Sequence, residues 1–188
     1  RVHRPGYQTA ASVRSEIAWM EALGASGLAT PAVVRSDTGE PVLEVDVGEE
    51  APRLVAIFTW IDGQPLARID QPGLWERLGA LMATVHVHGR AWPRPSGFVR
   101  QSWDAEGMVG SERPLWGDPV ALGTWDAPVE RAIVAARATV RERLARLPQT
   151  PDRYGLVHAD LAFENVIVRP DGEAVLIDFD DCGFSLYL

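Results

Sequence analysis

The stretch VHADLAFENVIVRPDGEAVLIDFDD (residues 157–181) contains two short β-branched apolar runs, each bordered by polar side chains. Residues 165–168 and 174–178 therefore predict two strands. The Asp171-Gly172 pair between them is a strong signal for a hairpin turn. Buried carboxylates are costly unless something pairs with them, so the polar ends of this hairpin need a partner.

The expected register of the hairpin suggests what that partner is. With the turn centred on Asp-Gly, Val168 lies opposite Val175, and Asn165 lies opposite Asp178. Cross-strand Cβ atoms are about 4.5–5.5 Å apart. At that separation the amide oxygen of Asn165 and the carboxylate of Asp178 can share one hard cation such as Mg²⁺.

Two further polar residues, His158 and Asp160, precede the hairpin after the apolar segment YGLV. Asp160 lies five residues before Asn165, so it shares the loop of the predicted cation. A carboxylate beside two metal-holding oxygens is compatible with phosphoryl transfer, because the catalysis of that reaction is mostly positioning and charge neutralisation.

Composition and charge exclude several classes of protein. The chain has 188 residues, of which 46% are hydrophobic, which fits a soluble globular protein with one domain or two small lobes. Its net charge of -8 argues against nucleic-acid binding, which depends on concentrated positive charge. Apolar runs such as 54–61 are far shorter than a membrane helix, and the one cysteine, Cys182, excludes an internal disulfide. We expect a cytoplasmic protein that binds neither nucleic acid nor membrane.

Hydrophobic periodicity outlines the remaining elements. Helical spacing predicts helices at 9–23, 74–89 and 127–147. Two short strand patterns surround the turn SDTGE (36–40), and the run 53–61 reads as a third strand, apolar enough to be buried on both faces. These patterns predict an α+β protein.

The motif His158-x-Asp160-x-x-x-x-Asn165, followed by Asp178-Phe179-Asp180, resembles the signature of the aminoglycoside phosphotransferase and choline kinase-like family. The resemblance implies a protein-kinase-like fold with two lobes. The small antiparallel N-lobe would be residues 1–61, the hinge and linker 62–73, and the mainly helical C-lobe 74–188. It also implies that Asp160 is the catalytic base, that His158 braces its loop, and that Asn165 and Asp178 hold Mg²⁺.

The upstream segments extend this resemblance. RSEIAWMEAL (14–23) is similar to the family's N-lobe helix, whose glutamate, here Glu16, orients a phosphate-binding lysine. The chain has no lysine, and Arg1 takes that position. IFTWIDG resembles the hinge, where backbone groups of Thr59 and Ile61 would bind the base of ATP or GTP. The family's glycine-rich loop and its last helices are missing, so we expect an incomplete N-lobe and a truncated C-lobe.

Three functions follow as hypotheses. The first is a Mg-dependent kinase that moves the γ-phosphate of ATP or GTP to a hydroxyl of a small molecule. The second is a catalytically impaired, nucleotide-binding pseudokinase-like module, since arginine is not equivalent to lysine at a phosphate site. The third is a metal-dependent phosphohydrolase.

The acceptor and the oligomeric state are less constrained. Negative charge favours an amine-bearing acceptor, and the tryptophans of the aperiodic segment 91–125 form either a cage for such an amine or ordinary packing. Truncation predicts uncovered apolar residues on 54–61 and 127–147, which would promote self-association.

Overall fold

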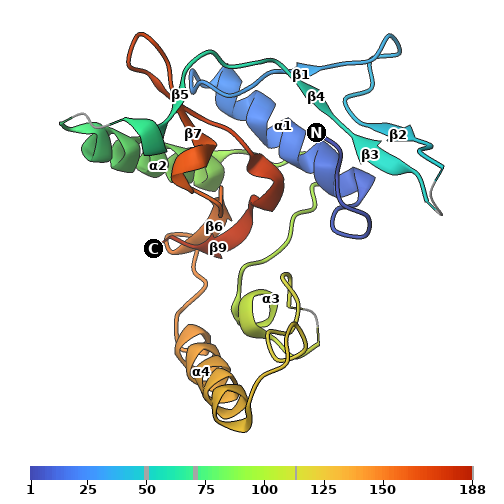
Figure 1. Ribbon diagram of the computed structural model, residues 1–188. Coiled ribbons are helices and arrows are strands. Elements are labelled where there is room, and N and C mark those ends of the chain that lie inside the picture. The colour runs from blue at the N-terminus through green and yellow to red at the C-terminus, as the bar shows by residue number, and fades with distance from the viewer. Residues whose placement is uncertain (49–50, 70–71, 113, 188) are drawn as a thin grey trace.

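The computed structural model describes residues 1–48, 51–69, 72–112 and 114–187 (Figure 1). It mixes helices and strands, which confirms the expected α+β class. The helices are α1 (Ala10–Ala25), α2 (Leu74–Ala91), α3 (Ala105–Val109) and α4 (Ala127–Ala145). The strands are β1 (Val33–Val34), β2 (Leu43–Val45), β3 (Arg53–Val55), β4 (Ile57–Phe58), β5 (Gln64–Pro65), β6 (Tyr154–Val157), β7 (Val166–Val168), β8 (Ala174–Leu176) and β9 (Gly183–Leu186).

Helix α1 forms where the periodicity predicts a helix. Thr9 caps its start, because the threonine side chain accepts a hydrogen bond from the Ser12 N–H. Val13 and Ile17 are buried at helical spacing, and Glu16 lies on the same buried side with 1% of its surface exposed. The periodicity that folds this helix therefore also buries a carboxylate.

The run 53–61 does not form the single strand, buried on both faces, that its apolar composition predicts. It is divided at Ala56 into β3 and β4, which pair with β2 and β1 respectively. Ile57 is 52% exposed and Trp60 is 87% exposed. Ile57 lies within β4 opposite the exposed Val34, in a sheet of only two strands, and the ladder with β1 ends at Phe58, so Trp60 lies beyond the sheet.

The predicted hairpin is present as β7 and β8, but the predicted register is wrong by one residue. Val168 pairs with Ala174, and the Ile177 N–H donates to the Asn165 carbonyl at 3.0 Å, so Asn165 lies opposite Ile177 and not opposite Asp178. The cause is a three-residue loop closed by Gly172, which has φ +86°. Such a loop needs a left-handed residue at this position, which glycine supplies without strain.

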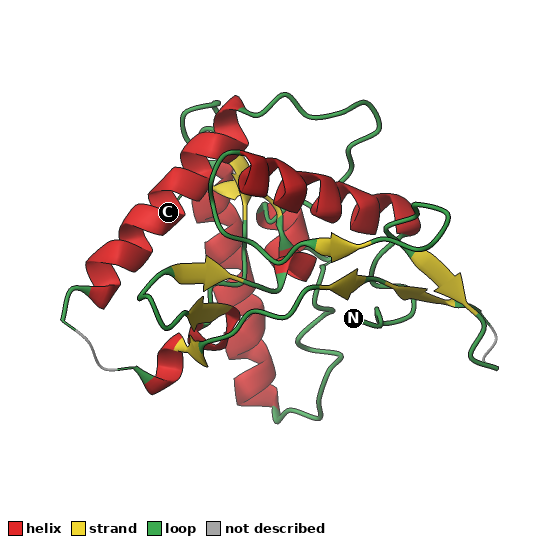
Figure 2. Cartoon of the chain, turned by 90° about the horizontal axis from the view of Figure 1, so that it is seen from above, coloured by secondary structure: helices red, strands yellow, loops and turns green. Residues whose placement is uncertain are grey.

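The expected linker 62–73 contributes a strand to the same sheet. Within it β5 pairs with β7, giving the order β5-β7-β8. Gly63 permits this approach, because a Cβ at that position would lie 2.5 Å from the Val168 carbonyl oxygen. Residues 70–71 of the linker lie outside the described residues. Figure 2 shows the strands as short separate groups, and in the described chain β1 to β4 do not pair with the hairpin.

The main core lies between α1, α2 and the strands of the C-terminal third. Trp19 of α1 meets Phe179 edge to face, with ring centroids 5.7 Å apart. Helix α2 packs against β6 at Gly89, where a Cβ would lie 2.7 Å from the Leu156 carbonyl oxygen. This packing fixes the position of β6, whose end carries the first predicted site residue.

Helix α4 stands apart from that core and contacts α3 (Figure 1). All of its residues are at least partly exposed, including the apolar Val129 and Val140. The expected uncovered apolar surface on 127–147 is therefore confirmed. None of the helices in the described segments is long and apolar enough to cross a membrane.

Candidate active site

The segment that follows β6 is held in a strained conformation. Ala159 has φ +68°, in the left-handed region that alanine seldom adopts. On one side of it His158 is buried, and on the other Asp160 is half-buried. A strained backbone conformation persists only where the surrounding structure enforces it, and such conformations are common at functional sites.

The His158 ring supplies part of that enforcement. Its Nε2 lies 2.9 Å from the Ile177 carbonyl oxygen, and its Nδ1 accepts the Asp160 N–H at 3.3 Å. Burial lowers the pKa of His158, so the ring is neutral, with the proton on Nε2. Both nitrogens are used in holding the loop, which suits a brace better than a base.

Asn165 holds the Asp160 carboxylate directly. Its amide nitrogen donates to Asp160 Oδ2 at 2.8 Å and to the Asp160 carbonyl at 3.0 Å. The amide oxygen makes no hydrogen bond to the described residues, so it remains available as a ligand. The two residues that the sequence places five apart are therefore joined through Asp160 Oδ2, and the Asn165 amide oxygen is left to bind another group.

Asp178 occupies a second strained position, with φ +61°, just after β8. The Arg1 guanidinium pairs with its carboxylate and also lies 3.3 Å from Glu16 Oε1. Burial raises the pKa of Glu16, and the positive charges of Arg1 and Arg100 oppose that rise. The structure thus brings together the predicted Glu16–Arg1 pair and the predicted metal ligand Asp178.

A cavity of about 380 Å³ adjoins these charged groups. Arg1, Glu16 and Asp178 line one part of it, and the hinge residues Thr59 and Ile61 line another. The Thr59 N–H donates to the Ala32 carbonyl at 2.8 Å. The Thr59 carbonyl and the Ile61 N–H make no hydrogen bond to described residues, so these two lining residues keep one acceptor and one donor available to a ligand.

The donor set fits a magnesium ion bound together with phosphate. The Asp178 carboxylate and the Asn165 amide oxygen are hard ligands, and Mg²⁺ commonly takes one or two such protein groups and completes its shell with water and phosphate oxygens. In the described residues, groups of three or more His, Cys, Asp or Glu side chains arranged for a metal do not occur.

Sequence reasoning missed Arg100, whose side chain is completely buried. Its Nε donates to the Cys182 carbonyl at 2.7 Å, and its Nη1 donates to Ser12 Oγ at 2.9 Å. Its Nη2 donates to the Asp180 carbonyl. Arg100 thus ties α1 to the turn after Asp178. It lies in the aperiodic segment 91–125, and its acceptors are mostly backbone carbonyls, so no sequence pattern marks it.

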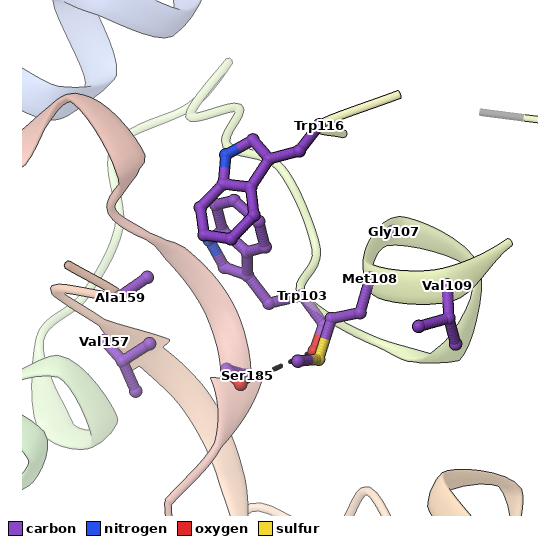
Figure 3. Close-up of a pocket in the computed structure, with 8 residues that line it drawn as sticks. All are labelled: Trp103, Gly107, Met108, Val109, Trp116, Val157, Ala159 and Ser185. Atoms are coloured by element: carbon purple, nitrogen blue, oxygen red, sulfur yellow. Dashed lines mark hydrogen bonds between the residues drawn. The ribbon is translucent and has the colours of Figure 1, made fainter. Parts of the chain in front are cut away.

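A second, smaller cavity of about 210 Å³ begins at the same loop (Figure 3). Ala159 and Val157 form one wall, and Trp103 and Trp116 form another. The two indoles meet at 62°, with centroids 5.0 Å apart. The Trp103 indole N–H donates to the Asp181 carbonyl at 2.7 Å, which ties this wall to the turn after Asp178.

The remaining tryptophans of segment 91–125 do not line that cavity. Trp92 packs edge to face on Phe98, with centroids 5.3 Å apart. The Trp125 N–H donates to the Pro119 carbonyl at 2.9 Å. Ordinary packing thus accounts for these two, and the cage hypothesis is left with Trp103 and Trp116.

Comparison with known proteins identifies the group to which this arrangement belongs. Residues 1–188 match the family described as the phosphotransferase enzyme family. The chain is 25% identical to amicoumacin kinase of Bacillus subtilis (strain 168), covering 92% of this chain and 48% of that protein. It is 32% identical to homoserine kinase of Methylorubrum populi, covering 84% of this chain and 44% of that protein. The chain thus spans about half the length of the curated relatives it matches.

Solved structures agree with that grouping. A microcompartment-associated aminopropanol kinase superposes with a TM-score of 0.83 at 35% identity, covering 100% of this chain and 58% of that one. An amicoumacin kinase in complex with AMP-PNP and Ca²⁺ superposes with a TM-score of 0.77 at 21% identity, covering 95% of this chain and 51% of that one. At 21% identity, the similarity to the amicoumacin kinase structure shows a shared fold.

Proposed function

Because the chain belongs to the phosphotransferase enzyme family, we propose that it takes part in Mg-dependent transfer of the γ-phosphate of ATP to a hydroxyl of a small, amine-bearing molecule. The observation that carries this proposal is the hydrogen bond that joins Asn165 to the Asp160 carboxylate, together with Asp178 in the lining of a cavity that Thr59 and Ile61 also line. The amicoumacin kinase solved with AMP-PNP supports an adenine nucleotide as the donor.

Each residue has a defined task in the transfer. Asp160 accepts the proton of the acceptor hydroxyl as its oxygen forms a bond to the γ-phosphorus. The bond between that phosphorus and the β,γ-bridging oxygen breaks, and ADP leaves. Asn165 fixes the Asp160 carboxylate and, with Asp178, would hold Mg²⁺, which neutralises charge on the phosphates when bound.

The names of the relatives support the acceptor class. Homoserine and aminopropanol each carry an amine and a hydroxyl, and kinases of both are similar to this chain. The net charge of -8 suits a cationic acceptor for the same reason that it disfavours nucleic acid.

One observation favours the alternative of a nucleotide-binding module without turnover. Arg1 stands where the resemblance places a lysine, and its guanidinium already pairs with the Asp178 carboxylate. Arginine is bulkier and less easily re-aimed at a phosphate than lysine. Under this alternative Mg-dependent nucleotide binding remains, and no phosphorylated product forms.

The test uses the full natural polypeptide that contains these residues, with ATP, Mg²⁺ and a panel of small hydroxyl compounds. Asp160→Asn should slow single-turnover transfer by about 10²–10⁴-fold and leave Mg-nucleotide affinity nearly unchanged. Asp178→Asn should weaken Mg-nucleotide binding and move the metal dependence of the rate to higher concentration. Asp171→Asn, at the exposed turn of the same hairpin, is the matched control and should change neither.

Two results would contradict the assignment of roles. Full transfer activity in Asp160→Asn, with activity abolished in His158→Ala, would make the histidine the base. Unchanged Mg-nucleotide affinity in Asp178→Asn would make that carboxylate structural.

A further inference from the structure

The cavity beside Ala159 has the position that an acceptor site needs. Its wall includes Ala159, which directly precedes the proposed base Asp160 in the chain. Its volume of about 210 Å³ is below the roughly 300–1,000 Å³ of pockets that enclose drug-sized ligands. It is also separate in its lining from the cavity at the hinge. The cavity therefore suits a molecule of a few heavy atoms bound beside the nucleotide.

The lining of this cavity indicates the charge of its ligand. The eight lining residues include no charged side chain, and the most polar of them is Ser185. Two indoles line it at an angle to each other (Figure 3), which is an arrangement that attracts a cation to the ring faces. A ligand carboxylate would find no cationic partner among these residues, and leaving one unpaired is costly.

Charges of both signs lie next to this cavity. The Asp104 carboxylate accepts the N–H of the lining residue Gly107 at 3.0 Å. The Arg137 guanidinium donates to the carbonyl of the lining residue Val109 at 3.4 Å, but it is paired with the Asp118 carboxylate at 2.7 Å. The carboxylate at Gly107 therefore favours a positive ligand over a neutral or negative one, and the nearby guanidinium is already neutralised by its own partner.

We infer that this cavity is the acceptor site and that it selects an amino alcohol lacking a carboxylate, with the ammonium group against the Trp103–Trp116 pair. This inference rests on the proposed function and sharpens it. The inference predicts that the site prefers 1-amino-2-propanol, whose polar groups are an ammonium and a hydroxyl, to homoserine, which carries a carboxylate as well.

Trp116 is the side chain that tests the inference. It is 65% exposed, so its replacement should not unfold the protein, whereas Trp103 is buried and anchors the turn after Asp178. Trp116→Ala should raise the KM for 1-amino-2-propanol about 5- to 30-fold, by loss of a cation–π contact, and leave the KM for ATP unchanged. Trp116→Phe should recover part of the loss. Trp125→Ala is the matched control, since Trp125 is exposed in the same segment but does not line the cavity.

The assay compares three acceptors with the full natural polypeptide, and calorimetry measures their binding in the absence of turnover. We expect 1-amino-2-propanol to be bound and phosphorylated in preference to homoserine and to the neutral 1,2-propanediol. Preference for homoserine or the diol, or an unchanged acceptor KM in Trp116→Ala, would overturn the acceptor site while leaving the kinase proposal intact. Transfer from ATP to none of the three, together with no acceptor binding, would overturn both.

Discussion

Replacement of Arg100 is the most direct test of what holds the turn after Asp178 (Phe179–Asp181) in place. Its buried guanidinium donates to the Ser12 hydroxyl and to the carbonyls of Asp180 and Cys182. It also lies 3.9 Å from Glu16 Oε2, which has no hydrogen-bond partner among the described residues. Arg100→Ala therefore leaves several buried acceptors unsatisfied and removes a positive charge from beside a buried carboxylate.

The expected loss of stability follows from these contacts. Removing one partner from a buried charged pair costs about 3–5 kcal/mol, which for a protein of this size lowers the melting temperature by roughly 6–20 °C. Arg100→Lys should regain little, because a single ammonium cannot reach acceptors that the planar guanidinium spans.

The control is Arg146→Ala, which breaks an exposed pair with Glu142. Exposed pairs contribute up to about 1 kcal/mol, so this variant should melt within a few degrees of the parent. The measurements are thermal and urea unfolding of the three variants and the parent under identical conditions. If Arg100→Ala and Arg146→Ala were equally stable, the buried network would contribute nothing and the reasoning would be wrong.

Two further predictions use other parts of the structure. Gly89→Ala should destabilise the protein by about 1–3 kcal/mol, because the added Cβ would meet the Leu156 carbonyl oxygen. Gly79→Ala on the same helix has open space around the added Cβ and should stabilise the protein by up to about 1 kcal/mol. Urea unfolding measures both changes. Burial lowers the pKa of His158. The contribution of this side chain to stability should therefore be complete above about pH 6.5 and be lost as the pH falls through the folded-state pKa. If the free energy of unfolding depended on pH equally in the parent and in His158→Gln, this expectation would be wrong.

Local signals predicted much of this fold. The three longer helices were expected from periodicity and lie within two residues of their predicted ends. The hairpin was expected from Asp171-Gly172, but its register was not, because register depends on loop length. The Arg169 N–H pairs with the Glu173 carbonyl at 2.9 Å, which leaves three residues in the loop and not two or four. Nothing in the composition of the loop distinguishes these lengths.

The candidate site was predictable where its residues are close in sequence. The spacing of Asp160 and Asn165 led to a pair that the structure joins by a hydrogen bond. The Arg1–Glu16 pair was expected from family resemblance alone, since its partners come from separate elements. Neither sequence spacing nor family resemblance predicted Arg100, because a side chain that donates to backbone carbonyls leaves no pattern of complementary residues in the sequence.

The two arginines act differently on the segment that begins at Asp178. Arg1 pairs with the Asp178 carboxylate, which is 44% exposed, so a cation that binds there competes with the guanidinium. Arg100 binds backbone carbonyls of the following turn from the buried side and does not compete for that carboxylate. A cation bound at Asp178, as proposed, would displace Arg1 from that carboxylate while Arg100 keeps the turn, and with it the strained backbone of Asp178, in place. Replacing Arg1 should accordingly change metal affinity and also remove a positive charge from beside the buried Glu16, whereas replacing Arg100 should lower stability without freeing the Asp178 carboxylate.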